Sequence, residues 1–263
     1  MIRPLALVAA LAAPPVAAQT VDEIARLDVL PGWRAASGAQ MAGLRITLAP
    51  GWKTYWRAPG DAGIPPQIDL AGSQNVASAR PVWPVPEVFD QNGMRSIGYA
   101  GSVVIPLEVT PSGPGPARLT GTLDIGVCED ICVPMQLGFD APLPEDGARD
   151  PGIVAALVNQ PLSGAEAGLR AATCVIRPSD MGLEVIVRLT LPSAGGEEVV
   201  VIEAADPDIW ISEADVTRTG DMLEAASDLV HMTQNSFALD RSSLRFTVLG
   251  RDRAVDIRGC SAG

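Results

Sequence analysis

Residues 119–134 read Leu-Thr-Gly-Thr-Leu-Asp-Ile-Gly-Val-Cys-Glu-Asp-Ile-Cys-Val-Pro, and this stretch decides the fold class. Apolar side chains alternate with small or polar ones from Leu119 to Val127, which is the two-residue period of a strand with one face in a core. Three residues then separate Cys128 from Cys132, and a second apolar run follows them. The stretch therefore predicts two strands joined by a short hairpin that carries two cysteines.

Similar short apolar runs, each ended by turn residues, recur on both sides of this hairpin. In the first half of the chain we expect strands at 44–48, 103–109 and 133–139, and in the second half at 173–177, 183–191, 198–203, 229–233, 244–249 and 254–258. The 26 glycines and 23 prolines of the 263 residues suit many short strands better than long helices. This pattern is typical of β-sandwiches.

The two series of strands are separated by residues 140–151, which hold three prolines and show no apolar period. We interpret this segment as a linker and expect a short helix at 152–159. The predicted fold class is all-β, with two β-sandwich domains in tandem and a short helical linker between them. Their predicted boundaries are 19–141 and 152–263.

Residues 1–18 have the three parts of a secretory signal: a basic start at Arg3, an apolar run from Leu5 to Ala13, and small residues at Ala17 and Ala18. We expect cleavage after Ala18 and export of the remaining chain. The formal net charge of 19 − 31 = −12 speaks against binding to nucleic acid. We find no phosphate loop, zinc spacing or nucleophile elbow, and expect no metal and no cofactor.

Four cysteines in an exported chain indicate disulfides, with three connectivities open. In the chain-entropy model, a bridge from Cys174 to Cys260 closes about 87 residues and contributes roughly 4.6 kcal/mol. A bridge from Cys128 to Cys132 closes about 5 residues and contributes roughly 2 kcal/mol. We therefore expect Cys174 and Cys260 to form a structural disulfide joining the first and last strands of the second domain.

The short pair suits reversible dithiol–disulfide exchange, which needs an accessible sulfur and a second cysteine close by. Cys128 is one residue out of phase with the apolar series that ends at Val127, so its side chain should point away from the core and be accessible to a partner. The flanking Glu129 and Asp130 should raise the thiol pKa, which makes exchange depend on a specific partner.

Two other interpretations of the short pair stay open. It is a hairpin staple if the chain is a non-catalytic binding or scaffold module. It is a Cu(I) site if Cys128, Cys132 and Met135 supply soft sulfur ligands, as in a copper-tolerance protein. The spacing also resembles the Cys-x-x-x-Cys loop in the dinuclear copper domain of cytochrome oxidase, a site that calls for two histidines. Such a centre is excluded here, because Gln136 stands where that resemblance places one of them and the chain has only one histidine.

Five ordered blocks carry a family resemblance. They read Pro-Gly-Trp-Lys-Thr-Tyr-Trp-Arg-Ala-Pro-Gly-Asp-Ala-Gly at 50–63, Trp-Pro-Val-Pro-Glu-Val-Phe at 83–89, Gly-Tyr at 98–99, Val-Ile-Pro-Leu-Glu-Val at 104–109, and Val-Cys-Glu-Asp-Ile-Cys-Val-Pro at 127–134. Together they resemble the N-terminal periplasmic domain of DsbD- and ScsB-type thiol:disulfide interchange proteins. The second half of the chain is similar only in a general way to the longer exported region of ScsB-like proteins.

The resemblance implies an immunoglobulin-like domain in the periplasm whose redox pair is Cys128 and Cys132. Its electrons would come from a membrane-embedded DsbD-, ScsB- or CcdA-like donor, or from a thioredoxin-like domain in trans. They would pass to periplasmic thioredoxin-fold oxidoreductases or substrates. Phe89 corresponds to the aromatic tip of a cap loop that shields the pair, with ordinary core packing as the alternative.

The remaining conspicuous residues have plain structural interpretations. We expect Trp52, Tyr55 and Trp56 to pack in the core or at a sheet edge rather than to form a carbohydrate platform. His231 has no serine or cysteine motif beside it, and we expect it to be structural or to face solvent.

Overall fold

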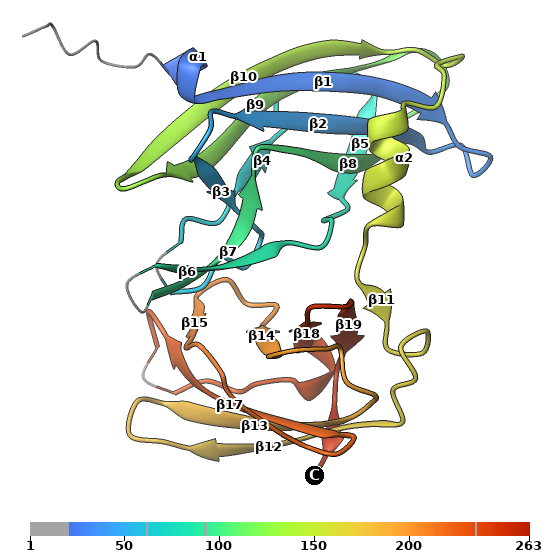
Figure 1. The fold of residues 1–263 in the computed structure, drawn as a ribbon. Coiled ribbons are helices and arrows are strands. Elements are labelled where there is room, and N and C mark those ends of the chain that lie inside the picture. The colour runs from blue at the N-terminus through green and yellow to red at the C-terminus, as the bar shows by residue number, and fades with distance from the viewer. Residues whose placement is uncertain (1–20, 62, 92–93, 235) are drawn as a thin grey trace, which may run out of the picture.

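The computed structural model describes residues 21–61, 63–91, 94–234 and 236–263 (Figure 1). Strands dominate, arranged in several sheets, and the α-helices are short: α1 (Val21–Ile24) and α2 (Pro151–Val158). This agrees with the expected β class. The secretory signal expected at residues 1–18 lies outside the described residues.

Two sheets form the N-terminal half, which we define as residues 21–143. The four-stranded sheet has the order β1 (Ala25–Arg34), β2 (Gln40–Leu48), β8 (Ser102–Pro111) and β5 (Val76–Pro81). The six-stranded sheet has the order β10 (Cys132–Leu143), β9 (Ala117–Cys128), β3 (Lys53–Tyr55), β7 (Met94–Ala100) and β6 (Glu87–Gln91), with β4 (Gln67–Asp69) also paired to β9. Alternate side chains of these strands point inward and form one hydrophobic core.

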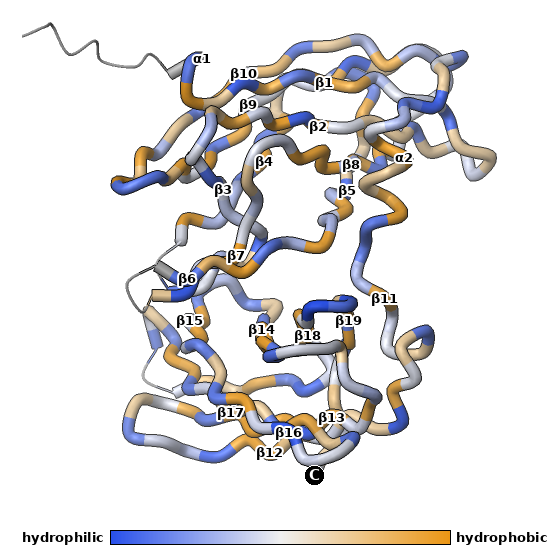
Figure 2. Tube along the Cα trace, viewed as in Figure 1, coloured by the Kyte–Doolittle hydropathy of each residue, from blue (hydrophilic) through white to orange (hydrophobic). Residues whose placement is uncertain are grey.

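The C-terminal half, residues 162–262, also has two sheets. The four-stranded sheet has the order β11 (Leu162–Ser163), β19 (Ala254–Arg258), β18 (Arg245–Leu249) and β14 (Val199–Glu203). The six-stranded sheet has the order β15 (Ile209–Ile211), β17 (Met222–His231), β13 (Leu183–Thr190), β12 (Ala171–Pro178) and β20 (Ser261–Ala262), with β16 (Asp215–Thr219) also paired to β17. A second core lies between these sheets. Figure 2 shows apolar and polar residues alternating along the strands of both halves.

The linker differs from its expected extent. Strand β10 continues to Leu143, and the helix α2 begins at Pro151. The carboxylate of Asp150 accepts hydrogen bonds from the backbone N–H groups of Gly152 and Ile153, an N-cap with proline at the first helical position. The fully buried Ile153 then packs this helix against the N-terminal half.

The two halves share an apolar contact. The sheet of β14, β18 and β19 has one face toward the C-terminal core and one face away from it. The side chains of Val199, Leu249 and Ala254 lie on the second face and belong to the hydrophobic cluster of the N-terminal half. Figure 1 shows the two halves stacked, with α2 and the linker along one side. The contact therefore involves a sheet face as well as the linker.

Candidate functional site

The two cysteines of the hairpin lie directly opposite each other. Strands β9 and β10 pair so that Cys128 faces Cys132 and Val127 faces Val133, and the turn holds the three residues between the cysteines. A disulfide joins the two cysteines, whose Cα atoms are 4.1 Å apart. The hairpin geometry expected from the sequence is confirmed.

The two cysteine residues differ in exposure. Cys128 is only 2% exposed, whereas Cys132 is exposed. The expectation that Cys128 would be accessible is wrong, although its phase was right, since Val127 lies in the core cluster and Cys128 does not. The sheet face away from the core is covered at this point by the side chain of Tyr55 from β3, the strand that pairs with β9 in the same sheet and that the apolar pattern did not predict.

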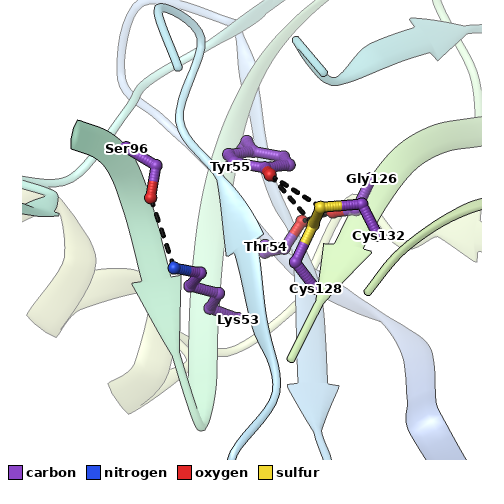
Figure 3. The surroundings of a disulfide bond; sticks show 7 residues. All are labelled: Lys53, Thr54, Tyr55, Ser96, Gly126, Cys128 and Cys132. Carbon is purple, nitrogen blue, oxygen red and sulfur yellow. Dashed lines mark hydrogen bonds between the residues drawn. A yellow bond between two sulfur atoms is a disulfide. The ribbon is translucent and has the colours of Figure 1, made fainter. Parts of the chain in front are cut away.

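Tyr55 of β3 covers the disulfide (Figure 3). Its hydroxyl oxygen lies 2.9 Å from Sγ of Cys128 and 3.2 Å from Sγ of Cys132. The ring lies over Gly126, where an added Cβ would be 2.9 Å from Cε2 of the tyrosine. Tyr55 is 3% exposed, and burial raises the pKa of its hydroxyl. The hydroxyl therefore keeps its proton at neutral pH and is available as a donor to sulfur.

Strand β3 is fixed to β9 by its neighbouring residues. Lys53 pairs with Cys128 and Thr54 pairs with Val127. The buried hydroxyl of Thr54 donates a hydrogen bond of 2.9 Å to the carbonyl oxygen of Gly126. These contacts place the side chain of Tyr55, which shares a face with that of Lys53, beside the sulfurs.

Lys53 connects this strand to the candidate cap residue. Its Nζ donates to Oγ of Ser96 at 3.3 Å and lies 5.0 Å from the ring centroid of Phe89. Lys53 is 8% exposed, and burial lowers its pKa. Phe89 is half-buried and lies outside the core cluster formed by the described residues. It lines a hollow of about 500 Å³ together with Trp52 and Lys53.

The hairpin tip is acidic and exposed. Glu129 and Asp130 are both exposed, and Ile131 between the carboxylates and Cys132 is 70% exposed. Glu129 lies close to Gly51, where an added Cβ would be 2.5 Å from Oε1 of the carboxylate. Gly51 also has a φ of 87°, a conformation that glycine adopts without strain.

The third ligand of the copper interpretation lies on the wrong face. Met135 is 6% exposed and belongs to the N-terminal core, whereas Cys132, three positions earlier on β10, lies on the opposite face of the strand. The geometry therefore does not favour a Cu(I) site built from these three residues.

The second cysteine pair has a different setting. A disulfide joins Cys174 and Cys260, whose Cα atoms are 5.7 Å apart. Cys174 is 1% exposed and lies in β12 within the C-terminal core. Cys260 was expected in the last strand, but it lies in the short link between β19 and β20. Gly259 before it has a φ of 69°, and this turn ends β19.

Other conspicuous residues agree with their plain interpretations. Trp52 and Trp56 belong to the N-terminal core. His231 is buried, and its Nε2 lies 3.4 Å from a carboxylate oxygen of Asp206. Its Nδ1 accepts a 3.3 Å hydrogen bond from the backbone N–H of Thr233, and its Nε2 also lies 3.0 Å from the side-chain nitrogen of Gln234. These contacts agree with the structural role expected for this histidine.

Sequence reasoning missed two residues that bear on the site. Tyr55 was assigned to packing, but its hydroxyl contacts both sulfurs. Arg57 was not singled out, although its guanidinium group binds Glu203 in the C-terminal half. The sequence signal was the two-residue spacing of Lys53, Tyr55 and Arg57. The surroundings of these three side chains depend on the pairing of β3 with β9, a strand some 70 residues later in the chain. The local sequence pattern does not reveal that pairing.

The fold and the hairpin define a β-rich protein with a disulfide between one exposed and one buried cysteine, beside a tyrosine hydroxyl. Residues 25–143 match the family model described as "Thiol:disulfide interchange protein DsbD, N-terminal", as the resemblance predicted. Among the solved structures, the chain is similar to the N-terminal periplasmic domain of ScsB from Proteus mirabilis. That match has a TM-score of 0.71 and 22% identity, and it covers 94% of this chain and 97% of the other.

A comparison with curated proteins gives no match. Within the part of the chain that the structure describes, no helix has the length and apolar character needed to cross a bilayer. The structural match therefore supports the fold over nearly the whole chain, and the family match supports the class of chemistry for residues 25–143.

Proposed function

We propose that this chain is a periplasmic thiol–disulfide exchange protein that relays electrons through Cys128 and Cys132. The donor is a membrane-embedded redox protein of the DsbD, ScsB or CcdA type, or a thioredoxin-like domain in trans. The acceptors are periplasmic thioredoxin-fold oxidoreductases or other disulfide substrates. One observation carries the proposal: the disulfide joins an exposed residue, Cys132, to a buried one, Cys128, and a tyrosine hydroxyl lies within hydrogen-bond distance of both sulfurs.

The exposure difference sets the order of bond changes. A thiolate of the donor attacks Sγ of Cys132, forms a mixed disulfide with it, and breaks the bond to Cys128. Cys128 leaves as a thiolate and accepts a hydrogen bond from Tyr55. A second donor thiol, as thiolate, then attacks the mixed disulfide and releases Cys132, so the donor is oxidised to a disulfide and the pair gains two electrons and two protons. Reduction of a substrate disulfide runs these steps in reverse.

A hairpin staple in a non-catalytic scaffold module is the alternative function. A staple needs neither an exposed cysteine residue nor a hydrogen-bond donor on the sulfurs, so the setting of the pair favours exchange. The proposed location rests on the secretory signal expected at residues 1–18, on cysteines paired as disulfides, and on the similarity to a periplasmic domain.

Redox titration tests the proposal with an internal control. The native chain is equilibrated in glutathione and thioredoxin buffers, alkylated, and mapped by mass spectrometry, so that the two disulfides are followed separately. Cys128–Cys132 should titrate at a potential less negative than about −300 mV, the region of exchanging disulfides, while the buried Cys174–Cys260 bond stays oxidised. Joint reduction of both pairs at a more negative potential would support the staple instead.

A further inference from the structure

The segment that covers the disulfide continues directly into the contact between the two halves. Tyr55 reaches both sulfurs, and Arg57, two residues later, reaches the C-terminal half. Its Nε donates to Oε1 of Glu203 at 2.9 Å, and its Nη2 donates to Oε2 of the same carboxylate at 2.8 Å. The same short segment therefore contacts the redox pair at one end and strand β14 at the other.

The contact between Arg57 and Glu203 is well defined. Their side chains are only 12% and 20% exposed, so the pair is largely shielded from water. Nη2 also donates to the hydroxyl of the fully buried Thr247 at 3.1 Å, and the guanidinium group lies 3.7 Å from the ring centroid of Trp56. Two parallel hydrogen bonds and a stacked ring fix the plane of a guanidinium group as well as its position.

The residue between Tyr55 and Arg57 is also held. Trp56 is fully buried, and its backbone N–H donates to the carbonyl oxygen of Ile97 on β7 at 2.9 Å. A change in the position of Arg57 therefore also shifts the backbone of Tyr55, because the tightly packed Trp56 between them leaves the backbone little freedom to adjust. Hydrogen bonding to sulfur depends on distance, so the hydroxyl of Tyr55 is sensitive to such a change.

We infer that Arg57 and Glu203 are a positioning pair, through which the C-terminal half holds the hydroxyl of Tyr55 on the Cys128–Cys132 disulfide. The inference rests on the proposed exchange function. It gives the C-terminal half a part in the redox step, since that half supplies Glu203 and the buried Thr247 that complete the contact.

A second ion pair between the halves provides a matched control. Arg95 on β7 binds Glu213 of the C-terminal half, and Arg95 is 22% exposed. This pair also joins the halves, but it does not lie on the segment that carries Tyr55. A substitution of Glu213 therefore removes an interdomain charge without disturbing the proposed route.

The experiment compares Glu203→Gln with Glu213→Gln, each made with Tyr55 present and in a Tyr55→Phe background. The readout is the rate at which reduced glutathione opens the Cys128–Cys132 disulfide, together with the equilibrium constant against glutathione. With Tyr55 present, Glu203→Gln should slow opening by roughly three- to tenfold, the range over which remote residues modulate a coupled site. Glu213→Gln should leave the rate unchanged.

The Tyr55→Phe background distinguishes an effect of Glu203 on the position of the Tyr55 hydroxyl from a general destabilisation of the protein. If the pair acts through the hydroxyl, Glu203→Gln should have little further effect once that hydroxyl is gone. Arg57→Lys, which keeps the charge but loses the two-pronged geometry, should resemble Glu203→Gln in rate. Thermal unfolding of each variant checks that the protein remains folded at the assay temperature.

Two outcomes have distinct meanings. Equal rates for Glu203→Gln, Arg57→Lys and the native chain, or an equal effect of Glu203→Gln with and without the Tyr55 hydroxyl, would overturn the positioning role and leave the exchange function standing. A native chain whose Cys128–Cys132 bond does not exchange with any thiol buffer would overturn the proposed function and this inference together.

Discussion

At the scale of single residues, the hydroxyl of Tyr55 can be tested cleanly because the chain has only two tyrosines. Tyr55→Phe should slow opening of the disulfide by roughly ten- to a hundredfold, since a hydrogen bond to a charged group contributes roughly 1.5–3 kcal/mol and each 1.4 kcal/mol is about a factor of ten. Burial raises the pKa of Tyr55, so the hydroxyl is protonated, and the difference should persist to at least about pH 9. Stopped-flow kinetics with glutathione measure it.

Tyr99→Phe is the control for this substitution. Tyr99 is also buried, but its hydroxyl donates to the carbonyl oxygen of Pro84 at 2.9 Å. Its loss should lower stability by about 1 kcal/mol without changing the rate of disulfide opening. Equal slowing by both substitutions would show that the effect belongs to general destabilisation and not to the sulfur contact.

Phe89 is predicted to act as a cap, and its substitution distinguishes a cap from a core residue. Phe89→Ala should speed alkylation of the reduced cysteines by iodoacetamide and leave the midpoint of chemical denaturation nearly unchanged, because the ring lies outside the core cluster of the described residues. Phe139→Ala is the matched control. Phe139 is 7% exposed within that core, and its truncation should cost about 3–5 kcal/mol. A collapsed midpoint for Phe89→Ala with unchanged alkylation would remove Phe89 from the site.

At the scale of elements, the hairpin of β9 and β10 predicts which of the two cysteines forms the mixed disulfide with a partner. With Cys132 exposed and Cys128 buried, Cys128→Ser should trap a mixed disulfide on Cys132 when the variant is mixed with oxidised glutathione or an oxidised thioredoxin. Cys132→Ser should give much less adduct on Cys128. Mass spectrometry of the intact chain reads both results, and a stronger adduct on Cys128 would contradict the order of steps proposed above.

The hairpin also shows how far the sequence pattern reaches. Strands β2, β8, β9 and β10 were predicted because their apolar residues alternate over a long stretch, and the pairing of Cys128 with Cys132 followed from a three-residue turn. Strand β3 has only three residues, all buried, so it shows no alternation. Its pairing with β9 decides the burial of Cys128, and this is why the accessible cysteine was assigned wrongly.

The C-terminal half shows a related limit. Strand β17 was expected at 229–233 but runs from Met222 to His231, because its inward positions include the small residues Ala225 and Ser227, which weaken the apolar signal. Strand β1 contains Pro31 and Gly32 at a shift in its register with β2, so its period is interrupted. In both strands the burial comes from packing against neighbours rather than from local composition.

At the scale of the whole molecule, the two disulfides have different surroundings. One lies on a hairpin and includes the exposed residue Cys132, and the other joins Cys174 in the C-terminal core to a residue 86 positions later. The contact of Arg57 with Glu203 and the apolar face of β14, β18 and β19 bring the two halves together. We propose that the halves are two domains of one redox unit, in which the C-terminal half stabilises the arrangement of the redox site through these contacts.

The last prediction separates the structural disulfide from the redox pair. The double variant Cys174→Ala, Cys260→Ala should unfold at a clearly lower denaturant midpoint, because the bridge closes a loop of about 87 residues and contributes roughly 4.6 kcal/mol in the chain-entropy model. Under native conditions its Cys128–Cys132 pair should keep the potential of the native chain, since Glu203 and Thr247, through which the C-terminal half holds Arg57, lie on β14 and β18 and not on β12, where the bridge begins. Non-reducing peptide mapping of the native chain supplies the starting point. Free thiols at both positions, or linkage to Cys128 or Cys132, would contradict this division of roles.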